Sequence, residues 1–419
     1  MKKITFLFVI TLLSISLKTN KSLAAAFATD SHSTSVIGTS FAGQATGAHD
    51  ISDSFSNAAN LSDIDKSQLV LSTIFLDINI DEDNTSAQYS NSNPVSGSRN
   101  DDAGEDALIP AFYFATPIND KTTFGLGVTM PFALATKYDE EWVGRYHAVE
   151  SSIQTININP QIAYELLEDK LSVGFGFQAQ YMKAVLTKIA DFGVFTMNPG
   201  TNDQFAKAKG DDWGYGFTLG TKYKINDKLE AGIGYRSKIK HKLNGDIKAG
   251  TYESEIDAPI TTPEILDMGL KYQLTDNAEI LSDVIWTRWS RINSLDIIAY
   301  SNSSILSESQ LMDLQDAWKY ALGLNFKANN KWLLRLGTSY ETSAVDKYRR
   351  PSIPSGNKLS IGTGFSYKLN ENSNIDFAYM HQFLSKVQSD LESTSKTSSL
   401  ETNYKTSVDI FALGFKYEF

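Results

Sequence analysis

The sequence predicts an all-β membrane protein: a 14-stranded antiparallel outer-membrane β-barrel plugged by an N-terminal hatch. Three observations predict it, namely an export signal at the amino terminus, period-two alternation of apolar and small residues, and short turns that alternate with long polar connections. The mean hydropathy of −0.24 is close to that of a soluble protein. Because only alternate residues of a barrel strand face lipid, a barrel keeps such an average.

The composition excludes several other classes of protein. The chain has 419 residues, of which 42% are hydrophobic, so disorder of the whole chain is excluded. The sequence contains no cysteine, which excludes disulfides and thiolate sites. A formal net charge of −11 leaves no basic excess to neutralise phosphates, so we expect no nucleic-acid partner.

The amino terminus has the parts of a secretory signal peptide. Lys2 and Lys3 precede an apolar run over residues 4–17, and Ala24 lies among small residues that suit cleavage. The apolar run is too short to cross a bilayer comfortably, which makes a transmembrane anchor the weaker interpretation. We predict a signal peptide over residues 1–24. Since no later apolar run is long enough for a spanning helix, membrane insertion would require closed strands.

The strand pattern is clearest over residues 171–181, where odd positions are apolar or aromatic and even positions are Ser, Gly or Gln. A soluble sandwich also alternates, but its outer face carries most of the charge. Here glycines crowd the second face, and aromatic residues gather at strand ends as in the girdles of an outer-membrane barrel. The same alternation recurs over residues 229–235, 332–340, 359–367 and 411–419.

The turns give the number of strands. Six short polar turns occur at residues 117–121, 167–170, 226–228, 275–277, 328–331 and 370–374. Seven long polar connections occur at residues 81–106, 137–151, 187–212, 241–262, 291–316, 342–357 and 385–404. Short turns on one side and long loops on the other are typical of a bacterial barrel with periplasmic turns. With a first strand near residues 68–80 and a last strand ending at Phe419, the turns predict fourteen strands.

The segment before the first strand is rich in Ala, Ser, Gly and Asp and has no sustained alternation. A barrel of fourteen strands leaves a lumen that side chains of the wall alone do not fill. We therefore predict a hatch over residues 25–66, inside a barrel over residues 67–419. The alternative is a disordered periplasmic tail.

A series of short motifs follows in a specific order along the mature chain. They are Ala25-Ala26-Phe27, Gly38, Phe41-Ala42-Gly43, Asn57-Ala58-Ala59, Trp142-Val143-Gly144-Arg145-Tyr146, Asn157-Ile158-Asn159-Pro160, Gly234-Tyr235-Arg236-Ser237, Trp286-Thr287-Arg288-Trp289-Ser290, Asp316-Ala317-Trp318, Ala321-Leu322-Gly323 and Tyr379-Met380-His381. By these motifs the chain resembles the FadL family of outer-membrane long-chain fatty-acid transporters, which includes TodX-like aromatic-hydrocarbon channels. Asn57-Ala58-Ala59 stands where the family usually has Asn-Pro-Ala, and this departure leaves open whether the motif gates as in the family.

The resemblance implies a plugged fourteen-stranded barrel, in agreement with the count from the turns. It also implies that substrate is captured among the outer loops, moves to a pocket near the mature amino terminus, and leaves sideways through a gap at a kink in the third strand. Our third strand, residues 122–136, carries Pro131. Because proline donates no ladder hydrogen bond, we expect the wall to be unpaired there. The alternative places Pro131 at the extracellular end of the strand.

Candidate binding residues follow from the chemistry of an amphiphile, whose tail needs an apolar channel and whose carboxylate needs a cation. Lys183 shares the parity of the apolar face and can snorkel toward the interface, whereas Lys188 has the opposite parity and is the stronger candidate for the lumen. The basic candidates are Lys183, Lys188, Arg236 and Arg288. The apolar candidates are Phe27 for the pocket floor, with Phe192 and Phe195 for the extracellular groove.

Besides Pro131, two residues are candidates for holding or gating the hatch. Asn57 is the polar residue expected to hold the hatch to the wall. Glu341 is an acid that could hold the Asn57 region through its amide donors, and the alternative is a solvated acid.

Two other functions were weighed. A barrel phospholipase needs a nucleophile, but Gly38 to Gly43 departs from the nucleophile elbow at Ala42, and the five histidines show no metal-ligand spacing. We therefore predict no enzyme activity, no cofactor and no metal. A general porin would keep an open, charge-lined lumen, whereas this chain has a segment that fills it.

The sequence thus predicts a channel in the outer membrane of a Gram-negative bacterium for passive uptake of hydrophobic or amphipathic molecules. Long-chain fatty acids are the first expectation and aromatic hydrocarbons the alternative. Besides the substrate, the expected partners are outer-membrane lipid, lipopolysaccharide and the barrel-assembly machinery. We expect a monomer.

Overall fold

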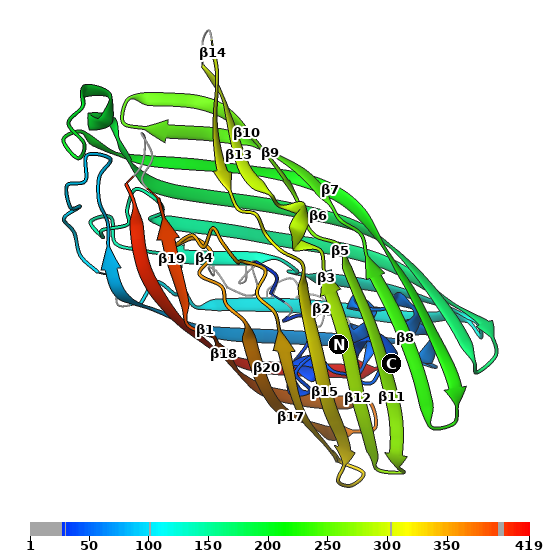
Figure 1. The fold of residues 1–419 in the computed structure, drawn as a ribbon. Coiled ribbons are helices and arrows are strands. Elements are labelled where there is room, and N and C mark those ends of the chain that lie inside the picture. Colours follow the sequence, from blue (N-terminus) through cyan, green and yellow to red (C-terminus); the bar gives the residue numbers. More distant parts are fainter. Residues whose placement is uncertain (1–26, 30, 100–101, 302–303, 393–397) are drawn as a thin grey trace.

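The computed structural model describes residues 27–29, 31–99, 102–301, 304–392 and 398–419. The predicted signal peptide lies outside these residues. The chain forms one antiparallel sheet that closes into a barrel (Figure 1), because β1 (Gln68–Ser86) pairs with β20 (Leu400–Glu418). No helix in this part of the chain has the length and apolarity needed to cross a membrane.

The barrel has fourteen spans, as predicted, although kinks divide six of them into two strands. The undivided spans are β1, β2 (Ala107–Asn119), β5 (Glu150–Leu167), β6 (Leu171–Asp191), β7 (Asp203–Asn226), β16 (Trp332–Glu341), β17 (Lys358–Asn370) and β20. The divided spans are β3 (Thr122–Thr129) with β4 (Ala133–Lys137), β8 (Leu229–Arg236) with β9 (Lys240–Ala249), β10 (Tyr252–Thr261) with β11 (Ile265–Thr275), β12 (Ala278–Thr287) with β13 (Ser294–Ser301), β14 (Ser304–Leu311) with β15 (Ala317–Lys327), and β18 (Ser373–Leu384) with β19 (Val387–Leu391).

All six predicted short turns join consecutive spans at one end of the barrel. The long connections differ from the prediction, because several continue as paired strand. β6 and β7 run far into the predicted 187–212 loop, and β9 with β10 and β13 with β14 form hairpins inside two others, so that β14 stands out from the wall (Figure 1). Beyond the membrane both faces of a strand meet water, so polar residues occupy both faces and the alternation disappears while the hydrogen-bonded ladder continues.

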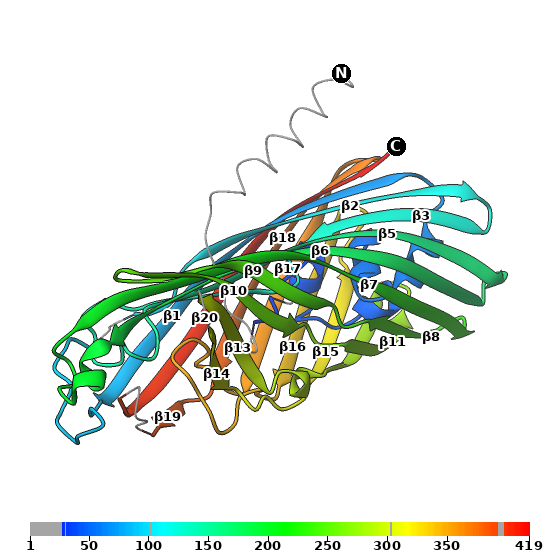
Figure 2. The same ribbon diagram turned by 90° about the horizontal axis from the view of Figure 1, so that it is seen from above.

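The hatch, defined here as residues 27–64, folds as short helices enclosed by the wall (Figure 2). Its elements are α2 (Thr34–Gly38), η1 (Gln44–Thr46), η2 (Ile51–Phe55) and η3 (Ala58–Asp63). α2 lies against β17 and β18, η1 against β8 and β11, and η3 against β5, β6 and β7. Side-chain caps begin two of the helices, since Asp50 accepts from the Ser52 amide and Asn57 from the Ala59 amide. The hatch is therefore a folded plug.

Glycines on the inner face of the wall let the hatch backbone come close. A Cβ at Gly234 would lie 1.9 Å from the carbonyl oxygen of Ser56, and a Cβ at Gly337 would lie 1.9 Å from that of Thr39. Neither position has room for a side chain. The hatch thus packs against the small-residue face of the strands that the sequence predicted. We call this inner, glycine-rich surface of the wall the seat of the hatch.

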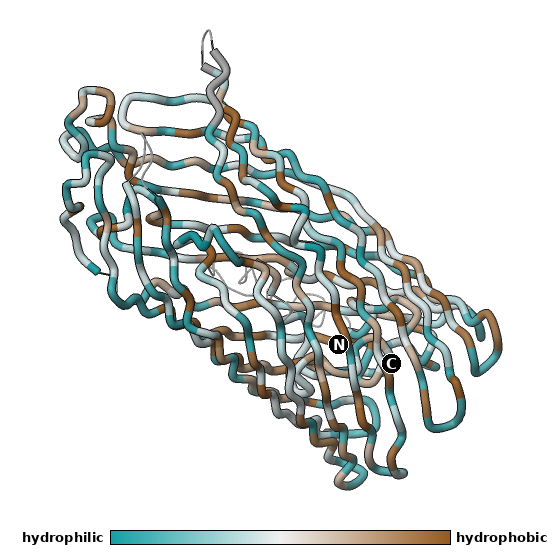
Figure 3. Tube along the Cα trace, viewed as in Figure 1, coloured by the Kyte–Doolittle hydropathy of each residue, from teal (hydrophilic) through white to brown (hydrophobic). Residues whose placement is uncertain are grey.

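The opposite face of the wall is apolar and exposed. Phe175 and Phe177 of β6 and Leu219 of β7 are 50%, 46% and 45% exposed, and buried glycines or polar residues alternate with them along the strands. Brown and teal segments accordingly alternate along the wall (Figure 3). This face suits contact with the hydrocarbon of a bilayer.

Candidate functional site

An apolar pocket lies between the hatch and the strand extensions on the side of the long connections. Its empty volume is about 810 Å³, part of which is open to solvent. The apolar lining includes Phe27, Ile153, Leu186, Ala208, Ile260 and Ile297. A second hollow shares five of these residues and continues between β6, β7, β9, β10 and β13. Together they form one apolar passage of the kind that holds a small hydrophobic molecule.

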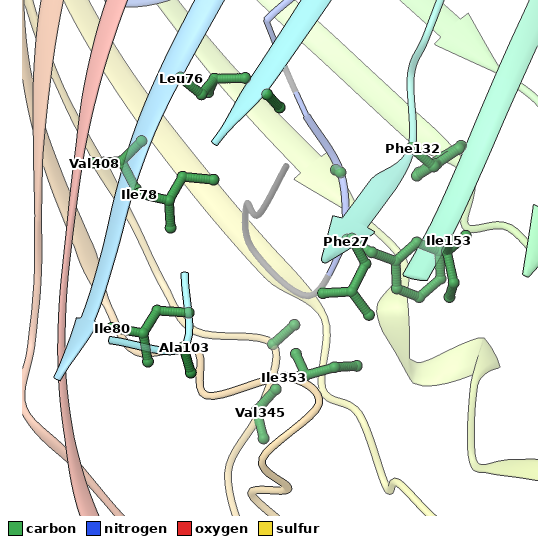
Figure 4. Close-up of a cluster of buried hydrophobic side chains, with 14 of the residues drawn as sticks. Phe27, Leu76, Ile78, Ile80, Ala103, Phe132, Ile153, Val345, Ile353 and Val408 are labelled. Carbon is green, nitrogen blue, oxygen red and sulfur yellow. The ribbon is translucent and has the colours of Figure 1, made fainter. Parts of the chain in front are cut away.

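Phe27 of the hatch lines this pocket, and two further aromatic rings pack against it. Phe27 packs edge-to-face against Phe132, with ring centroids 5.8 Å apart, and against Trp289, at 4.7 Å. Figure 4 shows Phe27, Phe132 and Ile153 pointing toward one another. Phe27 is only 2% exposed. Phe27, the first described residue of the hatch, therefore lies in the lining of this pocket.

The pocket lining also includes a cation and an imidazole ring. Lys188 points inward and forms an ion pair with Glu308 of β14. His147, in the loop between β4 and β5, lines the same pocket, and its Nε2 has no hydrogen-bond partner within the described structure. Burial, aided by the positive charge of Arg350, lowers the pKa of His147 to about 4. The lining thus offers one cation and one neutral imidazole.

Sequence analysis overlooked His147, although it directly follows the Trp142 to Tyr146 motif. The residue lies in a loop, where no periodicity tells which side chains face inward. Its place after a family-like motif was the one signal that could have singled it out.

The third span is interrupted between β3 and β4, at residues 130–132. β2 pairs with β3 only from Phe112 onward, and β4 pairs only with β5, so residues 107–111 have no partner on that side. Isolated bridges, Gly104 with Thr136 and Ser98 with Trp142, join the two sides again farther along. The wall therefore has a gap beside Pro131, within the span and not at its end.

The first residues of the hatch occupy the backbone groups that this interruption frees. The Thr29 amide donates to the Pro131 carbonyl at 3.1 Å, and the Ala133 amide donates to the Phe27 carbonyl at 2.9 Å. Since Phe27 also lines the pocket, the same few residues border both the pocket and the gap.

Asn57 and Arg236 join the hatch to the wall. The Asn57 Nδ2 donates to the carbonyls of Ala45, at 2.7 Å, and Thr221, at 3.0 Å. Arg236 donates through Nη1 to the Phe55 carbonyl at 2.9 Å, and its guanidinium lies 4.0 Å from the centre of the Phe55 ring. Arg236 does not line this pocket, because the hatch covers its inward-facing side chain.

Glu341 does not hold the Asn57 region. Its carboxylate forms ion pairs with Lys358, at 2.9 Å, and Lys319, at 3.6 Å, and all three side chains are buried. The amide donors of Asn57 are directed to backbone carbonyls. The acid is therefore neither solvated nor a hatch clamp at Asn57, because two lysines on neighbouring strands compensate its charge.

Four other candidates lie away from the pocket. Lys183 is exposed because its neighbour Met182 takes the inward face of β6. The Arg288 side chain is 46% exposed, with its Nη1 3.9 Å from Glu264. Phe192 and Phe195 lie on a short helix, η4 (Phe192–Thr196), at the end of the β6–β7 extension, where Phe195 is 73% exposed. Strand extension carries these two rings beyond the pocket.

The fold, the apolar pocket and the gap in the wall together define a plugged outer-membrane β-barrel transporter. The chain belongs to the outer membrane protein transport protein family (OMPP1/FadL/TodX), whose model matches residues 15–419. An outer membrane protein of Neisseria meningitidis serogroup B is 28% identical, over 89% of this chain and 90% of the relative. The long-chain fatty acid transport protein of Escherichia coli O6:H1 is 25% identical, over 88% and 89%.

The fold is also that of a solved relative. The crystal structure of a Pseudomonas aeruginosa FadL homologue superposes with a TM-score of 0.87 and 23% identity, over 94% of this chain and 100% of that one. The protein is thus an outer-membrane transporter of hydrophobic compounds in a family of transporters, not of enzymes.

Proposed function

We propose that this protein takes up long-chain fatty acids by passive diffusion. The observation that carries the proposal is the composition of the pocket: its lining is mostly apolar, and Lys188 supplies a cation. An acyl chain would lie along the apolar lining, and its carboxylate would replace Glu308 as the partner of Lys188. No catalytic step enters this mechanism.

The path begins at the outer end of the strand extensions and leaves through the wall. The exposed Phe195 ring offers a first apolar contact, and the passage between β6 and β13 leads inward to Phe27. For release, Phe27 and Thr29 would shift away from the Pro131 region, so that the substrate passes the gap between β2 and β4 into the membrane. Pocket and gap lie within one chain, so we propose that the monomer transports.

Aromatic hydrocarbons are the second candidate. The Phe27, Phe132 and Trp289 rings favour a flat aromatic guest, and Glu308 already neutralises Lys188, so the pocket does not demand an anion. The family description names both FadL and TodX.

Binding of radiolabelled oleate and toluene to the detergent-exchanged protein distinguishes the two candidates. We compare Lys188→Ala with Lys183→Ala, a matched control on the same strand whose side chain faces outward. Saturable oleate binding that weakens about fivefold in Lys188→Ala alone would support the fatty-acid proposal. Toluene binding without oleate binding would assign the protein to the hydrocarbon branch.

The exit route needs a separate experiment. Ala107 borders the gap and faces inward, whereas Leu108 beside it faces outward. We expect Ala107→Phe to retain oleate binding and to slow oleate uptake into cells, with Leu108→Phe as the control. Unchanged uptake in a folded Ala107→Phe protein would argue against release through the gap.

A further inference from the structure

A second cavity lies at the end of the barrel that carries the short turns, below the hatch. Its empty volume is about 660 Å³. The walls come from β15, β16, β17, β18 and β20, and from the turn between β15 and β16. His49 and Asp50 of the hatch close the inner end. In the orientation of the family this cavity opens to the periplasm.

The lining of this cavity is basic, although the chain as a whole carries a net charge of −11. Its five cationic residues are Lys327, Lys331, Arg335, Lys368 and Lys416. Its two carboxylates already accept hydrogen bonds: Asp50 from the Ser52 amide and the Ser35 hydroxyl, and Asp376 from Arg335 and Ser366.

Two of the lysines have carboxylate partners. Lys368 pairs with Glu371 at 2.7 Å and Lys416 with Glu418 at 3.1 Å. Both carboxylates lie outside the lining, and the Glu371 side chain is 90% exposed. Because an exposed pair such as Lys368–Glu371 contributes little to stability, a better acceptor inside the cavity can replace Glu371.

Arg335 supplies an independent sign of a missing ligand. The residue is 5% exposed and lines the cavity, and its Nη1 donates to Asp376 at 3.1 Å. Its Nε is buried and finds no acceptor among the described residues. A buried guanidinium N–H without an acceptor is unfavourable, and an anion bound close to this guanidinium would offset part of that cost by Coulomb attraction.

We propose that this cavity binds a small oxyanion, such as a phosphate or carboxylate group, through Arg335 and the surrounding lysines. Arginine and lysine are the side chains that bind such groups most strongly. The oxyanion belongs to a free periplasmic anion or to a phospholipid headgroup, since both offer the same chemistry. Because the lining includes hatch and wall, the bound anion would connect the two. This site is independent of the proposed transport of fatty acids.

Calorimetric titration of the full protein with inorganic phosphate tests the site. The variant is Lys327→Gln with Lys416→Gln, and the control is Lys224→Gln with Lys228→Gln, which lie at the β7–β8 turn and outside the cavity. We expect one saturable phosphate site in the wild type and the control, and affinity at least about tenfold lower in the variant. Equal affinity in all three proteins would overturn the proposal.

A second titration with dihexanoyl phosphatidic acid identifies the source of the oxyanion. Binding of this lipid without binding of phosphate would assign the site to a headgroup, and binding of neither would overturn it. Thermal melting checks that each protein is folded, and phosphate should raise the Tm of the wild type and the control only. Oleate binding by the same proteins tests transport separately, so either proposal can fail alone.

Discussion

The two halves of the barrel interior are built in opposite ways. In the half with the short turns, glycines such as Gly234 bring the hatch backbone directly onto the wall. In the other half, Ile153, Leu186 and Ile297 hold the walls apart and leave an apolar pocket. Strands with the same alternation therefore give different interiors. Where the inward-facing residue is glycine the hatch packs against the wall, and where it is a larger apolar residue a pocket remains.

The largest loss of stability is expected when a glycine that contacts the hatch backbone is replaced by a larger residue. Gly234→Ala puts a methyl group where the Ser56 carbonyl lies 1.9 Å away, so the hatch must move. We expect a loss of about 3 kcal/mol in the free energy of unfolding and the appearance of ion conductance in planar bilayers. Gly127→Ala is the control, because its nearest neighbour, the Tyr113 ring, is 3.3 Å away. A silent bilayer and unchanged stability for Gly234→Ala would refute the seat.

The next largest loss of stability is expected when the Asn57 side chain, which links the hatch to the wall by a hydrogen bond, is removed. Asn57→Ala removes two donors and the cap of η3, leaving the carbonyls of Ala45 and Thr221 without these bonds. We expect a loss of about 2 kcal/mol in denaturant unfolding and faster hydrogen exchange over η3. Asn198→Ala, in the exposed β6–β7 loop, should change neither.

In the pocket half, removal of a ring should affect binding more than stability. Phe27→Ala deletes the ring that joins Phe132 and Trp289, and oleate affinity should fall by about tenfold. Phe195→Ala, at the exposed tip, should leave equilibrium affinity unchanged and slow association. The opposite ranking of the two variants would place the main site among the outer loops.

The smallest effect is a pH dependence at His147. The pKa of His147 is about 4 in the folded protein, below the ordinary value of 6.5, because burial disfavours the charged ring. An unfolded chain binds the proton first, so the stabilising contribution is complete above pH 6.5 and disappears as the pH falls through 4. Tm measured from pH 7 to 4 should fall less steeply in His147→Gln. Parallel curves would contradict a neutral buried imidazole.

Local chemistry explains why much of the fold could be predicted. Clusters of Asn, Asp and Lys mark turns, and the number of turns gives the number of strands. Neither step requires knowledge of the tertiary packing. Parity on β6 also placed Lys183 outside and Lys188 inside, because one residue along a strand reverses the face. The parts of the strands that extend beyond the membrane could not be predicted, because they have no lipid-facing side and therefore no alternation of apolar and polar residues.

The partners of inward-facing charges could not be predicted. Arg236 and Glu341 both face inward, as their positions suggested. Arg236 nevertheless binds the hatch, whereas Glu341 forms ion pairs with two lysines of the wall. Their partners come from residues 181 positions away, in the case of Phe55, or from neighbouring spans. Such pairings depend on how the closed barrel and its plug meet.

By itself, the sequence determined the class of the fold, the number of spans and the presence of a segment available to fill the lumen, because alternation and turn chemistry act over a few residues. Only the tertiary structure decided which inward residues meet hatch, pocket or open cavity, and that the kink at Pro131 lies beside Phe27. Closure of the barrel brings distant strands and the hatch together, and burial then selects the partner of each polar group.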